Sequence, residues 1–325
     1  MREGSGKARD YLDGMVTRRQ FLLAALGGSV GLTQSWPPPT LAATGASLPS
    51  PVPWRPHVGD VDPAVKLQAA RLVEAVGNWG RPGAMRTGAG DLAAAHARAA
   101  AAGFDPALVA ALASLLGSGT RQVVRVRMAQ YGGILERAAS VLVVVDSWRA
   151  NADGTVSAGG ITLDVRLVRA TPRWQVVDVR PARPLPALAR PSKLAEHVIS
   201  DDRIRLPHSA RADVLGGGVH GSVLRLLRDL SRAHIVDVSV LRSGHPIHVF
   251  GTDRLSDHPR GRAVDVWALD GKPLALPANH GLAAEGMRFA VAHGAYNVGG
   301  PMLLPGSRFF SDRTHQDHIH LGFAV

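Results

Sequence analysis

The fold of the second half of the chain depends on the stretch Ser256-Asp257-His258-Pro259-Arg260-Gly261-Arg262-Ala263-Val264-Asp265. Pro259 and Gly261 disfavour a regular helix, so we expect His258 in a turn. Residues 262–269 then alternate in the way that predicts a strand. Asp265 lies on one face of that strand, and its apolar neighbours in sequence point to the other face.

A second stretch near the end of the chain reads His315-Gln316-Asp317-His318-Ile319-His320-Leu321-Gly322-Phe323. Its alternation predicts another strand, with Ile319, Leu321 and Phe323 in the core and His318 and His320 on the opposite face. Two imidazoles and a carboxylate from adjacent strands are therefore expected to converge. Two His and one Asp leave an open position on zinc, as in catalytic sites.

These two segments resemble the zinc-binding signature of the D-alanyl-D-alanine metallopeptidases, peptidase family M15, which are grouped with lysostaphin-type peptidases and the hedgehog signalling domain. The resemblance covers residues 195–325. It implies one Zn²⁺ per chain, held by His258, Asp265 and His320, in an α+β domain with a small antiparallel sheet and flanking helices. One such helix is expected at residues 223–232. Ser256 takes the place of the small hydroxyl residue that precedes the first ligand.

The sequence departs from the family pattern at the catalytic base. The family glutamate three positions before the last ligand is replaced by Asp317, which strand alternation turns away from His318 and His320 unless the chain is still in a turn there. Lysostaphin-type and hedgehog proteins carry a histidine two positions before that ligand, and His318 occupies this place. We favour His318 as the second catalytic group and keep Asp317 as the competing base.

A further departure affects substrate binding. Residues 243–246 read Ser-Gly-His-Pro where the family commonly has Ser-Gly-Tyr-Arg, so the arginine that would hold a substrate carboxylate is absent there. Arg254 is expected to replace it. The histidines at 245, 248, 280, 293 and 315 either line the cleft or lie on the surface.

The chain begins with a predicted export signal. Residues 17–32 place a twin arginine before a short apolar run, and small residues follow, so residues 1–46 resemble a twin-arginine signal peptide. The apolar run is too short for a stable transmembrane span. The order of twin arginine, apolar run and small residues predicts export by the twin-arginine route to the periplasm, the cell wall or the medium.

Between the signal and the zinc-like domain, the sequence predicts a Pro-rich linker at 47–61, an α+β accessory domain at 62–180 and a Pro/Arg linker at 181–194. In the accessory domain, helical periodicity precedes extended, alternating segments. The helical segments are 62–80 and 91–116, and the extended ones are 123–128, 139–148, 160–169 and 173–180. The last of these weakly resembles the closing strand of nuclear-transport-factor-2-like domains.

Composition limits the function classes. The 325 residues suit about two folded units, and the absence of cysteine excludes thiol catalysis, iron–sulfur clusters and Cys-type zinc fingers. A net charge of +11 favours an anionic partner such as peptidoglycan or another anionic cell-wall polymer. Dispersed arginines and 5% aromatic residues argue against a nucleic-acid partner. Of the 14 histidines, 12 lie at or after His197, which locates the chemistry in the last domain.

Together these features predict an exported zinc peptidase that hydrolyses peptidoglycan stem peptides, as a D-Ala-D-Ala carboxypeptidase or endopeptidase. Zinc would polarise the scissile carbonyl, and His318 or Asp317 would take the proton of the attacking water. The alternative is a non-catalytic zinc-containing cell-wall binding or regulatory protein. A third reading, an arginine-rich binder of nucleic acid or anionic lipid, predicts steeply salt-dependent binding.

Overall fold

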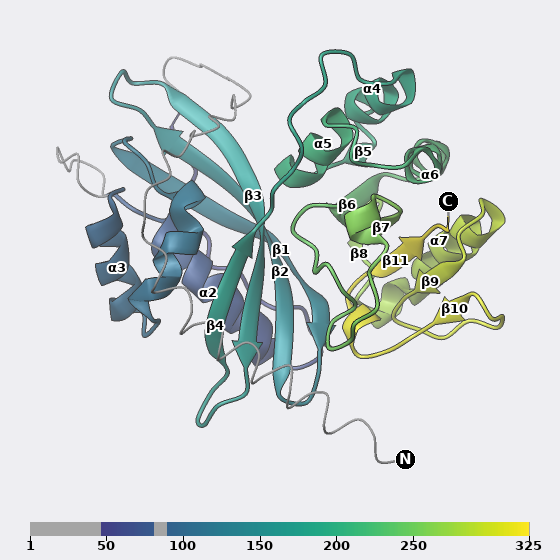
Figure 1. Ribbon diagram of the computed structural model, residues 1–325, viewed down its shortest axis with the longest axis horizontal. Helices are drawn as coiled ribbons and strands as arrows, with labels where there is room; N and C mark the ends of the chain where they lie inside the picture. The colour runs from purple at the N-terminus through teal and green to yellow at the C-terminus, as the bar shows by residue number, and fades with distance from the viewer. Residues whose placement is uncertain (1–46, 81–89, 325) are drawn as a thin grey trace.

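The computed structural model describes residues 47–80 and 90–324. The signal expected at residues 1–46 lies outside the described residues. The chain is an α+β protein with a four-stranded antiparallel sheet and a mixed seven-stranded sheet, which lie side by side along the molecule (Figure 1). We call them the four-stranded unit and the seven-stranded unit. The α+β class expected from the sequence is confirmed.

In the four-stranded unit, helices precede a meander of strands, as the periodicity predicts. The strands pair in the order β1-β2-β3-β4, with every pair antiparallel. The elements are α2 (Pro63–Gly77), α3 (Leu92–Ala101), the 3₁₀ segment η1 (Pro106–Leu115), β1 (Arg121–Ile134), β2 (Ala138–Ala150), β3 (Val156–Val168) and β4 (Gln175–Pro181).

The core of this unit lies between its helices and one face of its sheet. Val65, Leu72 and Val76 lie at helical spacing along α2 and are fully buried there. Trp54, from the segment expected to be a linker, also packs into this core, and its backbone N–H donates to the Glu74 side chain at 2.6 Å. The segment before α2 is therefore held against the unit that follows it.

The seven-stranded unit follows residues 182–192, which have no regular structure. Its strand order is β10-β9-β11-β7-β6-β5, and β8 pairs with β7. Its elements are α4 (Lys193–Ser200), β5 (Ile204–Arg205), α5 (His208–Leu215), α6 (Gly221–Ser231), β6 (Val236–Val240), η2 (His258–Arg260), β7 (Ala263–Leu269), β8 (Lys272–Pro273), η3 (Pro277–Asn279), α7 (His280–Ala292), β9 (Asn297–Gly299), β10 (Phe309–Phe310), η4 (Thr314–Gln316) and β11 (Ile319–Gly322).

The expectation of a purely antiparallel sheet here is wrong at both edges. β5 runs parallel to β6, and β10 runs parallel to β9, whereas the middle strands are antiparallel. The chain passes through α5 and α6 between β5 and β6, and such a long connection allows parallel pairing. The amphipathic helix expected at 223–232 is confirmed as α6, whose Leu224, Leu227 and Leu230 are buried in the core.

Pairing of β11 with β7 brings the two chemistry-bearing segments together. His320 lies opposite Asp265, and Leu321 lies opposite Val264. Ile319, Leu321 and Phe323 are buried in the apolar core, so the alternation expected from the sequence is confirmed. This register determines which polar side chains share the other face.

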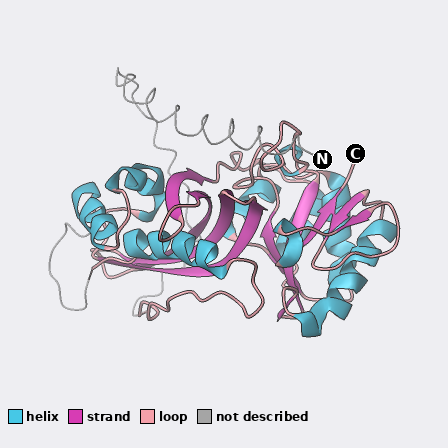
Figure 2. Ribbon diagram, turned by 90° about the horizontal axis from the view of Figure 1, so that it is seen from below, coloured by secondary structure: helices cyan, strands magenta, loops and turns pink. Residues whose placement is uncertain are grey.

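The second face of the four-stranded sheet packs against the seven-stranded unit (Figure 2). Buried polar side chains lie on this face, among them Asp164 and Arg166, whose ion pair is 2.6 Å long. The Arg166 guanidinium lies 5.1 Å from the Phe250 ring centre, and the Thr162 N–H donates to the Ser209 hydroxyl at 2.9 Å. The two units therefore share a packed interface. Among the described residues, no helix is long and apolar enough to cross a membrane.

Candidate metal centre

The three ligands expected from the sequence meet in the structure. His258 Nε2 lies 3.1 Å from Asp265 Oδ1 and 3.1 Å from His320 Nδ1, and the last two atoms are 3.0 Å apart. Zinc bound tetrahedrally at about 2.0–2.1 Å separates neighbouring ligand atoms by about 3.3 Å. The three atoms therefore form a triangle of nearly the size that a zinc ion needs.

The turn that carries His258 also orients its ring. η2 is a single 3₁₀ turn that ends at Gly261 with a φ of +67°, a conformation that favours glycine. His258 Nδ1 lies 2.5 Å from the Leu241 carbonyl oxygen, which only accepts, so Nδ1 carries the proton. Nε2 therefore presents a lone pair to the triangle, in the arrangement typical of a metal-bound histidine.

The electrostatics of the triangle suit a cation. Burial raises the pKa of Asp265, but the neighbouring His258 and His318 outweigh burial and hold the pKa well below its usual range. Burial also lowers the pKa of His320, to about 4, against the opposing effect of Asp265. Near neutral pH the centre thus contains a carboxylate and a neutral imidazole, the protonation states in which these groups bind metal.

A fourth side chain, His245, joins the group. His245, His258 and Asp265 offer ligand atoms that all lie within 4.8 Å of one another, so these residues could hold a metal ion. The His245 ring stacks on the His258 ring at 4.0 Å, and its Nδ1 lies 2.9 Å from the Pro246 carbonyl oxygen. Its Nε2 is therefore an acceptor. Of the five histidines left open by the sequence, His245 and His315 line the adjoining pocket, and His248 and His293 are exposed. The fifth, His280, is half-buried at the start of α7 and does not line the pocket.

His318 and Asp317 form a buried pair beside the triangle. His318 Nδ1 donates to Asp317 Oδ1 at 2.6 Å, while His318 Nε2 lies 3.6 Å from Asp265 Oδ2. The pKa of His318 is raised: burial lowers it, but the charges of Asp265 and Asp317 outweigh burial. His318 Nε2 thus faces the centre, and the bond from Nδ1 to Asp317 fixes this orientation of the ring.

Asp317 itself faces the four-stranded unit. It directly follows η4 and precedes the strand β11, so it is still in the turn that the sequence left open. Its Oδ2 accepts from the Tyr131 backbone N–H at 3.0 Å and from the Lys66 ammonium at 2.7 Å. Burial raises the pKa of Asp317, but Lys66 and His318 outweigh it and lower the pKa to about 2.

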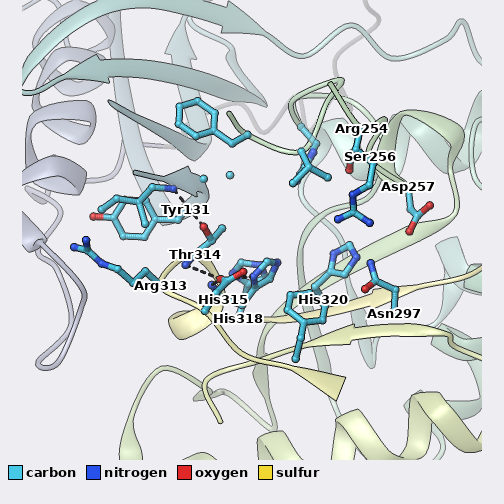
Figure 3. Close-up of a pocket in the computed structure, with 18 of the residues that line it drawn as sticks. Tyr131, Arg254, Ser256, Asp257, Asn297, Arg313, Thr314, His315, His318 and His320 are labelled. Carbon is cyan, nitrogen blue, oxygen red and sulfur yellow. Dashed lines mark hydrogen bonds and ion pairs between the residues drawn. The ribbon is translucent and has the colours of Figure 1, made fainter. Parts of the chain in front are cut away.

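A pocket of about 470 Å³ opens beside these groups (Figure 3). In Figure 3, Tyr131 and Arg313 lie on one side, Arg254 and Ser256 lie on the other, and the histidines lie between them. Arg254 is exposed, whereas Ser256 is buried, and its hydroxyl accepts from the His258 N–H at 3.4 Å. The pocket is lined by Tyr131, Gly132, Gly133, Ile134, Leu135, His245, Val249, Phe250, Arg254, Leu255, Ser256, Asp257, Asn297, Phe310, Asp312, Arg313, Thr314, His315, His318 and His320.

Lys66 and Gln130 also belong to this centre, although neither is part of a motif. Lys66 lies one turn before Ala70 on the buried side of α2. Lysine is rarely buried without a partner, so a lysine on the apolar face of a predicted helix could have indicated a buried ion pair from the sequence alone. Gln130 is buried, and its amide Nε2 donates to Asp265 Oδ2 at 2.5 Å. Its partner is 135 residues away along the chain, so no local pattern indicates the contact.

The comparisons with known proteins provide no family assignment. No protein-family model matches this chain, and searches of curated proteins and of solved structures find no match either. What the site can do is therefore argued from its own residues.

Proposed function

We propose that the chain is an exported zinc-dependent peptidase that hydrolyses peptidoglycan stem peptides, at a D-Ala-D-Ala bond or a related one. The observation that carries this proposal is the triangle of His258 Nε2, Asp265 Oδ1 and His320 Nδ1, with sides of 3.0–3.1 Å, beside an open pocket. Three protein ligands next to a pocket are the arrangement of a catalytic zinc site. The bound ion would supply Lewis acidity and a lowered pKa for water.

His318 is the proton acceptor in this proposal. Its Nδ1 proton is committed to Asp317, so Nε2 is the basic nitrogen, and it lies near the ligand Asp265. Asp317 is the weaker candidate for the proton acceptor, because its Oδ2 already accepts hydrogen bonds from Lys66 and the Tyr131 N–H. We therefore assign Asp317 the role of holding the His318 ring.

Arg254 and Ser256 have supporting roles. Arg254 lies at the rim of the pocket and is exposed, where its guanidinium can bind a substrate carboxylate. Ser256 steadies the turn that carries His258 through its hydroxyl. The basic net charge of the chain suits an anionic cell-wall polymer as the partner.

The finer fold assignment belongs to the same proposal. The motif at 256–265 and the His-x-His at 318–320 support a D-Ala-D-Ala-peptidase-like and hedgehog-like sheet for residues 195–325. The helices followed by a four-stranded meander support a nuclear-transport-factor-2-like domain at 62–180. The twin-arginine signal at 1–46 supports export.

The proposal is tested with the chain lacking residues 1–46, loaded with zinc and incubated with peptidoglycan stem peptides. In the His318→Ala variant we expect kcat to fall about 10²–10⁴-fold, the usual contribution of a general base, while zinc remains bound at one ion per chain. Asp317→Asn should lower kcat less, because the His318 ring remains in place. His248→Ala is the matched control, because His248 is exposed in the same unit. Absence of turnover in the zinc-loaded parent chain would contradict the peptidase proposal.

His245 favours a second candidate, a non-catalytic zinc-containing protein that binds or regulates the cell wall. If His245 were a fourth protein ligand, it would close the coordination sphere, as in structural zinc sites. The grouping of His245 with His258 and Asp265 supports this reading. The His245→Ala variant separates the two: a structural site would lose zinc affinity, whereas a catalytic site would keep it.

A further inference from the structure

Two consecutive residues of β1, in the four-stranded unit, reach the centre of the other unit. The Gln130 side chain donates to Asp265 Oδ2 at 2.5 Å, and the Tyr131 N–H donates to Asp317 Oδ2 at 3.0 Å. Both residues are buried, with exposed fractions of 0% and 1%. These contacts link the two units at the ligand Asp265 and at the partner of His318.

The Gln130 contact uses the oxygen of Asp265 that the triangle leaves free. Asp265 Oδ1 faces His258 and His320, whereas Oδ2 receives the Gln130 amide. A hydrogen bond to the second oxygen prevents the carboxylate from rotating and leaves Oδ1 for a cation. Hydrogen bonds of this kind orient metal ligands, and their loss typically costs 10–100-fold in metal affinity.

A bulge in β1 turns Gln130 toward the centre. Val124 and Val126 face the core of the four-stranded unit, and after the register shift between Val126 and Met128 the core residues are Ala129 and Tyr131. Side chains alternate along a strand, so this shift places Gln130 on the opposite face, against the seven-stranded unit. Without the bulge, Gln130 would point into an apolar core.

The other atom of the Gln130 amide is also informative. Among the described residues, the buried Gln130 Oε1 has no hydrogen-bond partner. The two polar atoms of an amide are about 2.2 Å apart, so this oxygen lies within about 5 Å of Asp265 Oδ2. It is a buried acceptor beside the expected ligand Asp265.

Lys66 completes the contribution of the four-stranded unit. Its ammonium pairs with Asp317 at 2.7 Å and also with Asp60, and its side chain is fully buried. Asp317 in turn holds His318. The unit therefore orients one expected ligand through Gln130 and the proposed base through Lys66 and the Tyr131 amide.

We propose that the four-stranded unit is an integral half of the metal centre rather than a separate binding module. Gln130 is a positioning residue for Asp265, and Lys66 together with the Tyr131 N–H positions Asp317. This inference rests on the proposed metal site and gives the four-stranded unit a role that its sequence does not indicate.

The test compares two glutamines of the same strand in the full chain. Gln130→Met removes the amide at the centre, whereas Gln122→Met removes an equally buried amide near the other end of β1, where it bonds to the Gly77 and Leu115 carbonyl oxygens. Zinc affinity is measured by competition with a chelator, the visible spectrum is recorded with Co²⁺, and thermal unfolding of the metal-free chains gives their stability. Gln130→Leu serves as a second variant if Gln130→Met does not fold.

We expect Gln130→Met to weaken zinc binding about 10–100-fold and to change the Co²⁺ absorption bands. Gln122→Met should lower the melting temperature without either effect. Unchanged zinc affinity and an unchanged Co²⁺ spectrum in a folded Gln130 variant would overturn the inference while leaving the metal site in place. A parent chain that binds neither ion would instead refute the proposed function.

Discussion

The two sheets differ in regularity, and the chemistry follows that difference. β1, β2 and β3 are 14, 13 and 13 residues long, whereas the strands of the other sheet have between 2 and 7 residues. The turns that carry His258 and Asp317 precede two of these short strands, β7 and β11. Loops on a rigid scaffold commonly carry functional residues, and here the long sheet supplies the rigid surface from the neighbouring unit.

The first prediction tests this comparison by removing Lys66, the buried cation that the four-stranded unit supplies. In Lys66→Met, Asp60 and Asp317 lose their ammonium partner inside the protein. An uncompensated buried charge costs about 3–5 kcal/mol, so we expect the free energy of unfolding to fall by that amount in urea titrations. Lys272→Met, at an exposed position in β8, is the control and should leave stability unchanged.

The effect of Lys66 on the free energy of unfolding should depend on pH in the acidic range. The pKa of Asp317 is lowered to about 2, below the ordinary value of about 3.9, so the unfolded state binds more protons between pH 4 and pH 2. Its stabilisation is therefore present above pH 4 and is lost as the pH falls toward 2. The difference in stability between Lys66→Met and the parent chain should shrink over this interval. A difference that stays constant from pH 6 to pH 2 would contradict the pairing.

The second prediction concerns the turn before the short strand β7, which carries His258. His258→Ala removes one corner of the ligand triangle. Loss of a direct ligand should exceed the 10–100-fold effect of losing a supporting hydrogen bond, so we expect zinc affinity to fall more than about 100-fold, which is about 2.7 kcal/mol. Elemental analysis and chelator competition measure the loss. His293→Ala, at the exposed end of α7, should retain the zinc of the parent chain.

The smallest effect is expected at an exposed ion pair of the long sheet. Arg180 pairs with Asp178 at 2.8 Å, with exposed fractions of 50% and 40%. Such pairs contribute about 0–1 kcal/mol, so Arg180→Met should change the urea midpoint little. Arg166 provides the matched contrast, since Asp164 and Arg166 have the same spacing but are buried. Similar losses of stability in Arg166→Met and Arg180→Met would show that burial at the interface between the units does not strengthen the ion pair.

Much of the site was predictable because its pattern is local. His258 and Asp265 are seven residues apart, and strand alternation separates His318 and His320 from the apolar residues between and after them. The helices and strands of the four-stranded unit also follow their periodicities. The parallel edges of the second sheet were not predictable in this way, because they depend on where β5 and β10 return after long connections.

The amino-acid sequence by itself determined which residues are polar on each strand face, and thereby proposed His258, Asp265 and His320 as one set. Only the tertiary structure decided the partners of that set. Gln130 reaches Asp265 across 135 residues, and Tyr131 reaches Asp317 across 186 residues. Periodicity records the local orientation of a side chain, whereas contacts between units depend on docking of their surfaces, which no short stretch of sequence encodes.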